Sequence, residues 1–223
     1  MLRWLPEAAS TYAKDIDGVF YFIYLLTAAI FLLVTVLMIW FLYKFRYKAG
    51  EERRAVYSHG NIALELIWTI IPAIVFIGIW VYSKSAWSTI KDPAHAPQGE
   101  MYVRVVAKQF QWDFQYPGPD GQFDTADDKV ILHELHVPAD KVVVVLLRGQ
   151  DVIHSFFIPV FRLKQDALPG REIRAWFQAT KAGKWEIPCA ELCGPGHSGM
   201  KGTVTVYSAE DYQNWVKKTW PSS

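Results

Sequence analysis

Residues Val19–Tyr43 read VFYFIYLLTAAIFLLVTVLMIWFLY, 25 consecutive positions without a charged side chain. A helix rises about 1.5 Å per residue, so a run of this length spans the roughly 30 Å hydrocarbon core of a bilayer. A cleaved signal peptide is the alternative, but its apolar segment is shorter and follows a basic segment, which is missing before Val19. We therefore predict a membrane-spanning helix over residues 19–43.

A second apolar run follows at Ile62–Tyr82. It is interrupted only by Glu65 and Pro72, and membrane helices tolerate both when a neighbour compensates for them. The sequence thus predicts a transmembrane hairpin over residues 19–83, with spans at about 19–43 and 62–82.

The charges around the two spans indicate their orientation. Residues 1–18 hold Arg3 and Lys14 beside three acidic residues, whereas the connection 44–61 carries five basic residues, namely Lys44, Arg46, Lys48, Arg53 and Arg54. Basic residues gather on the cytoplasmic side of membrane proteins. We expect residues 1–18 and everything after Ser83 to lie on the outer, periplasmic face of a bacterial inner membrane.

The overall composition excludes several classes. The chain has 223 residues, with 23 Lys+Arg against 22 Asp+Glu, and a dedicated nucleic-acid-binding protein normally shows a basic excess. Two cysteines are too few for a disulfide scaffold.

The outer region consists of short segments typical of strands. After a linker at 84–100, residues 101–208 alternate β-branched and aromatic runs with turns, and a helical period appears only in a C-terminal segment, 209–223. The predicted strands are Met101–Phe110, Ile131–Val137, Lys141–Arg148, Glu172–Phe177, Gly183–Ile187 and Thr203–Tyr207. This spacing favours a β-sandwich or a small Greek-key barrel.

Potential metal ligands are concentrated in Pro188–Met200, which reads PCAELCGPGHSGM. Both cysteines of the chain lie here, followed by His197 and Met200, and the glycines predict a loop that can wrap around a point. Thiolate, imidazole and thioether together favour copper over hard cations.

Two cysteines are one more than a mononuclear blue-copper site needs. A distinctive solution is that both sulfurs bridge two copper ions, each with its own imidazole and a weak axial ligand. The loop has one histidine, so the second ligand must come from elsewhere, and His154 after the valine-rich strand is the best candidate. Met200 and the carbonyl of Glu191 are candidates for the axial positions.

These features resemble subunit II of the haem-copper cytochrome c oxidases, over nearly the whole chain. The matching segments are the hairpin, Glu65–Thr69 with Pro72, Gln109–Tyr116, Val152–Phe156, Asp166–Arg171 and the copper loop. The resemblance implies a cupredoxin-like, all-β Greek-key barrel that carries a binuclear copper (CuA) centre. It implies six ligands: His154, Cys189, Glu191 through its carbonyl, Cys193, His197 and Met200.

The resemblance also implies an activity and partners. The chain would accept electrons from cytochrome c or a c-type haem domain and pass them to the haem of subunit I, where oxygen is reduced to water with proton pumping. Its partners would be subunits I and III and membrane lipid. The carboxylate of Glu191 is expected to help hold a magnesium or manganese ion at the subunit I interface, and Glu65 to mark the entrance of a proton path.

The aromatic stretch matches the point where electrons enter the family's copper centre, but it departs from the family at one position. The family commonly has tryptophan where this chain has Phe110, whereas Trp112 is retained.

Other interpretations remain open at this stage. The two cysteines could form a local disulfide or half of a zinc site, and Glu65 could cap or snorkel at the start of its helix. A membrane-anchored copper-delivery protein is the main rival function, but it predicts one span and a thioredoxin-like pattern. His133 and His136, three residues apart in one predicted strand, would lie on opposite faces and are interpreted as structural.

An acidic segment includes the aromatic stretch and extends beyond it. Residues 109–128 hold five aspartates and no basic residue; the aspartates are Asp113, Asp120, Asp124, Asp127 and Asp128. A solvated hairpin and, more weakly, a calcium loop are the simple explanations. Our hypothesis is that acidity beside exposed aromatic residues steers a basic cytochrome.

Overall fold

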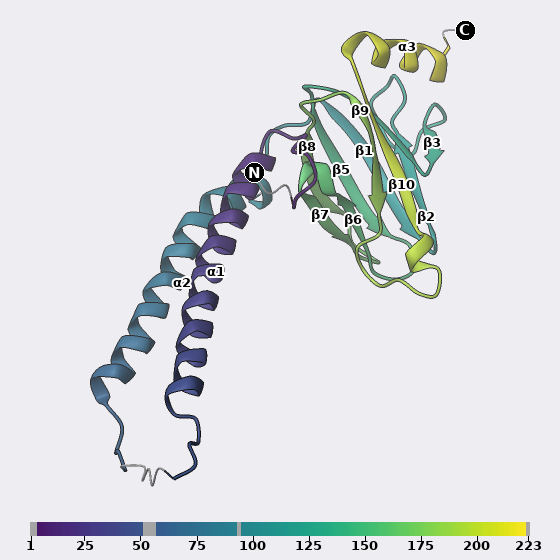
Figure 1. Ribbon diagram of the computed structural model, residues 1–223. Coiled ribbons are helices and arrows are strands. Elements are labelled where there is room, and N and C mark those ends of the chain that lie inside the picture. The colour runs from purple at the N-terminus through teal and green to yellow at the C-terminus, as the bar shows by residue number, and fades with distance from the viewer. Residues whose placement is uncertain (1–3, 51–56, 93–94, 222–223) are drawn as a thin grey trace. The chain divides into compact units, whose positions relative to one another are not determined.

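The computed structural model describes residues 4–50, 57–92 and 95–221 (Figure 1). Arg3, Arg53 and Arg54, which contribute to the charge argument for orientation, lie outside the described residues. The chain divides into two compact units: Asp17–Ala86 forms one, and the remaining described residues form the other.

The first unit contains most of two long helices, α1 (Ala13–Lys44) and α2 (Ile62–Lys91). Both are long and apolar enough to cross a membrane. The hydroxyl of Thr27 donates to the carbonyl of Ile23, 2.9 Å away, which satisfies a polar group inside the apolar run. Pro72 lies within α2, and the helix continues through it to Lys91, beyond the end of the predicted span.

The start of α2 is capped by a side chain. Oδ1 of Asn61 accepts hydrogen bonds from the backbone N–H groups of Ala63 and Leu64, at 3.0 and 3.2 Å. Glu65 lies in the first turn and is not the cap.

The second unit is built on ten strands, which confirms the all-β prediction. They are β1 (Met101–Lys108), β2 (Gln111–Tyr116), β3 (Lys129–Leu132), β4 (Glu134–Pro138), β5 (Val142–Gly149), β6 (His154–Ile158), β7 (Leu163–Ala167), β8 (Ile173–Gln178), β9 (Gly183–Pro188) and β10 (Lys201–Tyr207).

The strands form three sheets, in the orders β3-β2-β1-β5-β8, β4-β10-β9 and β6-β7. β1 pairs parallel to β5, and β10 pairs parallel to β4, while the other pairs are antiparallel. In the part of the chain that the structure describes, no pairing joins these sheets into a closed barrel. Side chains from all three sheets, such as Val145, Phe156 and Val204, fill one core between them.

The single strand predicted over Ile131–Val137 is wrong. His133 has φ +62°, outside the extended region, and it separates β3 from β4, which belong to different sheets. The argument from strand alternation therefore does not apply to His133 and His136.

The residues before α1 pack against the β unit. Ser10 forms a bridge with Ala179 just after β8, and the N–H of Thr11 donates to the carbonyl of Gln178 at 3.1 Å. The hydroxyl of Ser10 reaches the carbonyl of Phe161, and that of Tyr12 reaches Trp176. The segment thus extends the edge of the five-stranded sheet beyond β8.

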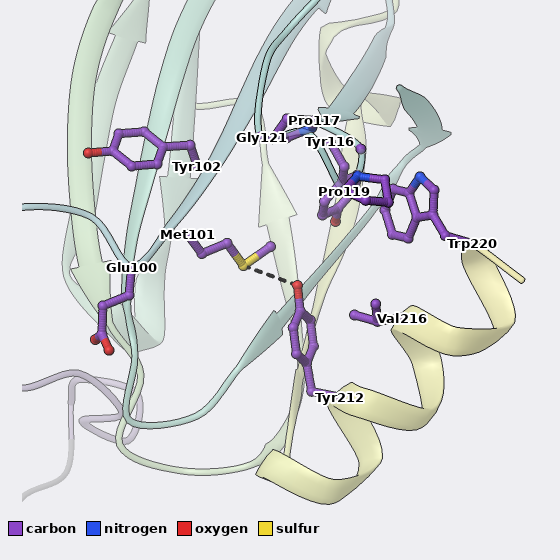
Figure 2. Close-up of a pocket in the computed structure, with 11 residues that line it drawn as sticks. Glu100, Met101, Tyr102, Tyr116, Pro117, Pro119, Gly121, Tyr212, Val216 and Trp220 are labelled. Atoms are coloured by element: carbon purple, nitrogen blue, oxygen red, sulfur yellow. Dashed lines mark hydrogen bonds between the residues drawn. The ribbon is translucent and has the colours of Figure 1, made fainter. Parts of the chain in front are cut away.

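A short helix, α3 (Ala209–Thr219), follows β10 and is capped by Ser208, whose hydroxyl accepts from the N–H of Asp211. Trp215 stacks on His136 with ring centres 4.9 Å apart. Beside α3, a hollow of about 360 Å³ is lined by aromatic and proline residues, among them Tyr116 and Trp220 (Figure 2). The turn Pro117–Gly121, within the acidic segment, borders the same hollow.

Candidate metal centre

The loop between β9 and β10 carries five of the six predicted ligands. Because Pro188 pairs with Lys201 in the antiparallel β9–β10 ladder, residues 189–200 must return on themselves. The N–H of Cys189 donates to the carbonyl of Met200 at 3.0 Å and closes the loop at its base. Gly194 has φ +131°, a conformation that favours glycine. A glycine at this position therefore allows the loop to turn sharply.

His154 comes from a separate sheet, as the first residue of β6. An isolated bridge joins Phe156 to Cys189, and the N–H of Ala190 donates to the carbonyl of Ser155 at 3.0 Å. These backbone contacts bring β6 beside the loop, so that the imidazole of His154 is completely buried next to the cysteines.

The structure brings all six predicted ligands together. The two cysteine sulfurs lie 3.9 Å apart, and the described residues form no disulfide. Sγ of Cys189 is 3.9 Å from Nδ1 of His154 and 3.3 Å from the carbonyl oxygen of Glu191.

Cys193 has a matching pair of neighbours. Its Sγ is 3.6 Å from Nδ1 of His197 and 3.7 Å from Sδ of Met200. Each sulfur therefore has one imidazole and one weaker donor beside it. The donors are soft, they converge, and both cysteines and Met200 are buried, so the cluster fits a copper site.

Asp151 orients the imidazole of His154. Its Oδ1 lies 2.8 Å from Nε2 of His154. Because an ionised carboxylate only accepts, Nε2 is the donor in this contact, and the other ring nitrogen, Nδ1, faces Cys189. Burial opposes ionisation of Asp151, but hydrogen bonds from His154 and from the N–H groups of Gln109 and Val152 outweigh it, and the pKa of Asp151 is about 2.

The thiol of Cys193 is held in its protonated form when no metal is present. Burial first, and then the adjacent Cys189, raise the pKa of Cys193 to about 11. A bound cation reverses this preference, since thiolates are the metal-binding form.

The two aromatic residues proposed for electron entry, Phe110 and Trp112, differ in their burial and in their neighbours. The ring of Phe110 is partly buried and lies against Gly194 and Gly196 of the loop. Trp112 is completely buried, with its ring centre 6.2 Å from that of His154. The expectation that the aromatic residues here are exposed is therefore wrong for Trp112.

Residues 117–128 of the acidic segment follow the end of β2 that is farther from the metal loop. Gln111 pairs with Lys108 near the loop, while Tyr116, at the other end of β2, is five residues or about 17 Å away. At that far end the indole N–H of Trp220 donates to the carbonyl of Asp127, and Arg104 pairs with Asp124 at 2.7 Å. These acids therefore gather around the Gln115–Tyr116 end of the aromatic stretch rather than around Phe110, and the hypothesis that they steer a basic cytochrome stays a prediction.

Asp113 is the exception among the five aspartates, because it lies on β2. It is nearly buried and forms an ion pair with Lys108 at 2.6 Å. Its charge is thereby compensated locally.

The two predicted glutamates lie in different units. Glu65 is in the first turn of α2, and Glu191 is an exposed residue of the metal loop whose carbonyl, not its carboxylate, approaches Cys189. Sequence reasoning missed Asp151 and Gln109. Asp151 precedes His154 by three residues, a spacing that could have suggested a carboxylate partner for the imidazole; Gln109 has no such signal.

Comparison with known families covers both units. Residues 2–85 match the transmembrane domain of cytochrome c oxidase subunit II, and residues 101–207 match its periplasmic domain. The chain is thus a membrane protein with two transmembrane helices and a periplasmic domain.

Individual relatives align with this chain over most of their own length. Cytochrome c oxidase subunit 2 of Thermostichus vulcanus is 32% identical, over 96% of this chain and 78% of that protein. The subunit of Cereibacter sphaeroides is 31% identical, over 95% and 78%. The crystal structure of the periplasmic domain of subunit II from Bradyrhizobium japonicum is 32% identical, with a TM-score of 0.47, and the match covers 55% of this chain and 95% of that one. Because both domain models match in order, and relatives above 30% identity align over most of their length, the chain belongs to the cytochrome c oxidase subunit II family.

Proposed function

We propose that this chain is the subunit of a respiratory haem-copper oxidase that receives electrons at a binuclear copper (CuA) centre. The proposed ligands are His154, Cys189, the carbonyl of Glu191, Cys193, His197 and Met200. The observation that carries the proposal is that each cysteine sulfur has one imidazole and one weaker donor beside it. Cys189 lies between an imidazole and a carbonyl, and Cys193 between an imidazole and a thioether.

The chain's own residues suit a site that exchanges electrons with little movement. Copper, when bound, would supply one-electron storage. The buried thiols share the site from two positions of one loop, and the backbone contacts of Cys189 with Met200 and of Ala190 with Ser155 hold that loop in place. A site whose ligands are held from several strands changes its geometry little when its charge changes.

The proposed partners follow from the family. The haem in subunit I would take the electron onward and reduce oxygen to water, coupled to proton pumping, and subunits I and III would bind the membrane helices. The exposed carboxylate of Glu191 is proposed to help hold a magnesium or manganese ion at the subunit I interface, and Glu65 to stand at the entrance of a proton path. Cytochrome c or a c-type haem domain is the proposed donor, arriving near Phe110, with the buried Trp112 behind it.

The proposed orientation places residues 1–18 and the β domain on the periplasmic side of a bacterial inner membrane. One feature supports it beyond the basic residues of the connection. Residues 9–12 hydrogen-bond with the β unit, so the two must lie on the same side of the membrane. Two membrane spans lie between residues 9–12 and the β unit, and an even number of spans returns the chain to the side from which it started.

Metal counting on the purified full chain in detergent tests the proposal. We expect two coppers per chain and the near-infrared band of an electron shared between two copper ions. A single copper would favour the copper-delivery alternative, and zinc with a colourless protein would favour a structural site; either result contradicts the proposal.

A further inference from the structure

Gln109 contacts the metal centre through two different groups. It lies in the turn between β1 and β2. Its backbone N–H donates to Oδ2 of Asp151 at 2.7 Å, and its side-chain amide donates to the carbonyl of Cys193 at 2.6 Å. These partners are 42 and 84 residues away in the sequence, so the turn links two segments that are distant along the chain.

The first contact acts on the histidine side of the centre. Asp151 uses Oδ2 for Gln109 and Oδ1 for Nε2 of His154, so the two oxygens of one carboxylate connect the turn to the imidazole. The N–H of Val152 also donates to Oδ1 and restricts the rotation of the carboxylate.

The second contact acts on the cysteine side. A Cβ atom placed on Gly194 would lie 2.6 Å from Nε2 of Gln109, so the amide lies directly against the loop backbone. The carbonyl that it binds belongs to Cys193, whose side chain is 3.9 Å from Cys189. The amide thus holds the loop at the residue that carries the second sulfur.

We propose that Gln109 is a positioning residue of the metal centre, setting the place of Cys193 directly and that of His154 through Asp151. The inference rests on the proposed function in treating this cluster as the copper site. The contacts themselves act on the chain before any metal is bound, and they can be tested in that state.

The separation of the sulfurs provides the test. At 3.9 Å they are well beyond the bonding distance of about 2.05 Å, so Cys193 must move before a disulfide can form. The amide of Gln109 opposes that movement. Without it, oxidation should accelerate: the two thiols lose two electrons and two protons to an oxidant such as diamide, which is reduced to the hydrazine, and one S–S bond forms.

The experiment uses the full chain in detergent, freed of metal with a chelator and treated with diamide. Gln109→Leu keeps the bulk without the donor, and Gln109→Glu keeps the length without the amide. Gln111→Leu is the matched control, because Gln111 lies in the same hairpin and binds Asp113 but not the metal loop. Disulfide formation is followed by alkylation of the remaining thiols and mass spectrometry.

We expect both Gln109 variants to oxidise about fivefold faster than the wild type, the factor that one net hydrogen bond supports, and the control to match the wild type. Unchanged rates in the Gln109 variants would overturn the inference. So would an equal acceleration in Gln111→Leu, because the effect would then come from a general loosening of the hairpin.

Copper titration of the same preparations provides a second measurement. The Gln109 variants should show a shifted near-infrared band relative to the wild type and the control; an unshifted band would count against the positioning role. Failure of the wild type to take up two coppers would refute the proposed function alone, since the thiol kinetics of the metal-free chain decide the role of Gln109 independently.

Discussion

The ring of Phe110 fills the space that a side chain at position 196 would occupy. A Cβ atom on Gly196 would lie 2.7 Å from both Cγ and Cε2 of the ring, closer than such atoms approach in proteins. The β1–β2 turn and the metal loop are therefore packed without room for even one methyl group.

Gly196→Ala should displace the metal loop for this reason. Overpacking of this kind costs about 1–3 kcal/mol, and we expect weaker copper binding with a lower midpoint of thermal unfolding. Gly199→Ala in the same loop is the matched control, because no atom lies within 4 Å of its Cβ position. In the double variant with Phe110→Ala, copper binding should partly recover. Equal effects of the two single alanine variants would show that the Phe110 contact is not the cause.

Cys193→Ser should abolish the signature of a shared electron. Serine cannot replace a bridging thiolate, so we expect the near-infrared band and the multiline hyperfine pattern to disappear in absorption and electron paramagnetic resonance spectra. The rest of the loop keeps its backbone contacts, and far-ultraviolet circular dichroism should remain unchanged. Persistence of both signals would disprove the bridging role of Cys193.

Asp151→Ala should weaken copper binding by about 10–100-fold, the usual cost of losing a hydrogen-bond partner of a metal-binding histidine. His154 would lose the acceptor that directs its Nδ1 toward Cys189. Competition with a copper chelator measures the affinity. Asp120→Asn, whose carboxylate binds only the nearby N–H of Gln122 among the described contacts, is the control and should bind copper as the wild type does. An unaltered affinity in Asp151→Ala would contradict this role.

Neutralising the acidic segment should leave electron transfer unchanged. Asp120 and Asp127 belong to the segment that follows Tyr116, which lies about 17 Å along β2 from Gln111 beside the turn, and the Debye length at physiological salt is about 8 Å. We expect the Asp120→Asn, Asp127→Asn double variant to be reduced by cytochrome c at the wild-type bimolecular rate in stopped-flow measurements. A marked loss of rate, reversed by added salt, would support the steering hypothesis instead.

The stability of the β unit should fall as the pH is lowered past the ordinary pKa of histidine. Burial lowers the pKa of His136 below 6.5, and this outweighs the opposing effect of Glu134. The unfolded chain then binds a proton more readily than the folded chain, so acidification favours unfolding until the folded pKa is reached.

Thermal unfolding between about pH 7.5 and 5.5 tests this prediction. His136→Phe preserves an aromatic ring to stack on Trp215 and should reduce the pH dependence. His133→Asn is the control, because asparagine tolerates the positive φ at that position, and it should titrate like the wild type. An identical pH dependence in His136→Phe would remove His136 as the cause.

The cluster of proposed metal ligands could be predicted because cysteine, histidine and methionine are scarce in this chain and several of them are crowded into one glycine-rich loop. His154 could be added because a second imidazole was needed. Helix α3 was predicted from the helical period of its sequence, and the two membrane-spanning helices were predicted from the length of their apolar runs.

Other features depend on contacts that leave no local pattern. The bond from Gln109 to Cys193 joins residues 84 positions apart. The break at His133 requires a positive φ that histidine seldom adopts, so alternation alone predicted one strand where there are two. The place of the acidic segment could not be predicted because adjacency in the sequence does not reveal which end of a strand faces the site.

The edge position of the first residues also has a consequence for biogenesis. Ser10 and Tyr12 precede both membrane helices in the chain, yet they bind Phe161 and Trp176, which are 151 and 164 positions later. In the orientation proposed above, the β domain cannot complete this edge until its own N-terminal segment has crossed the membrane and the C-terminal half has followed. Translocation of the first residues is therefore a step in folding the last, and a chain that inserts with its N-terminus on the wrong side would leave the sheet unfinished beyond β8.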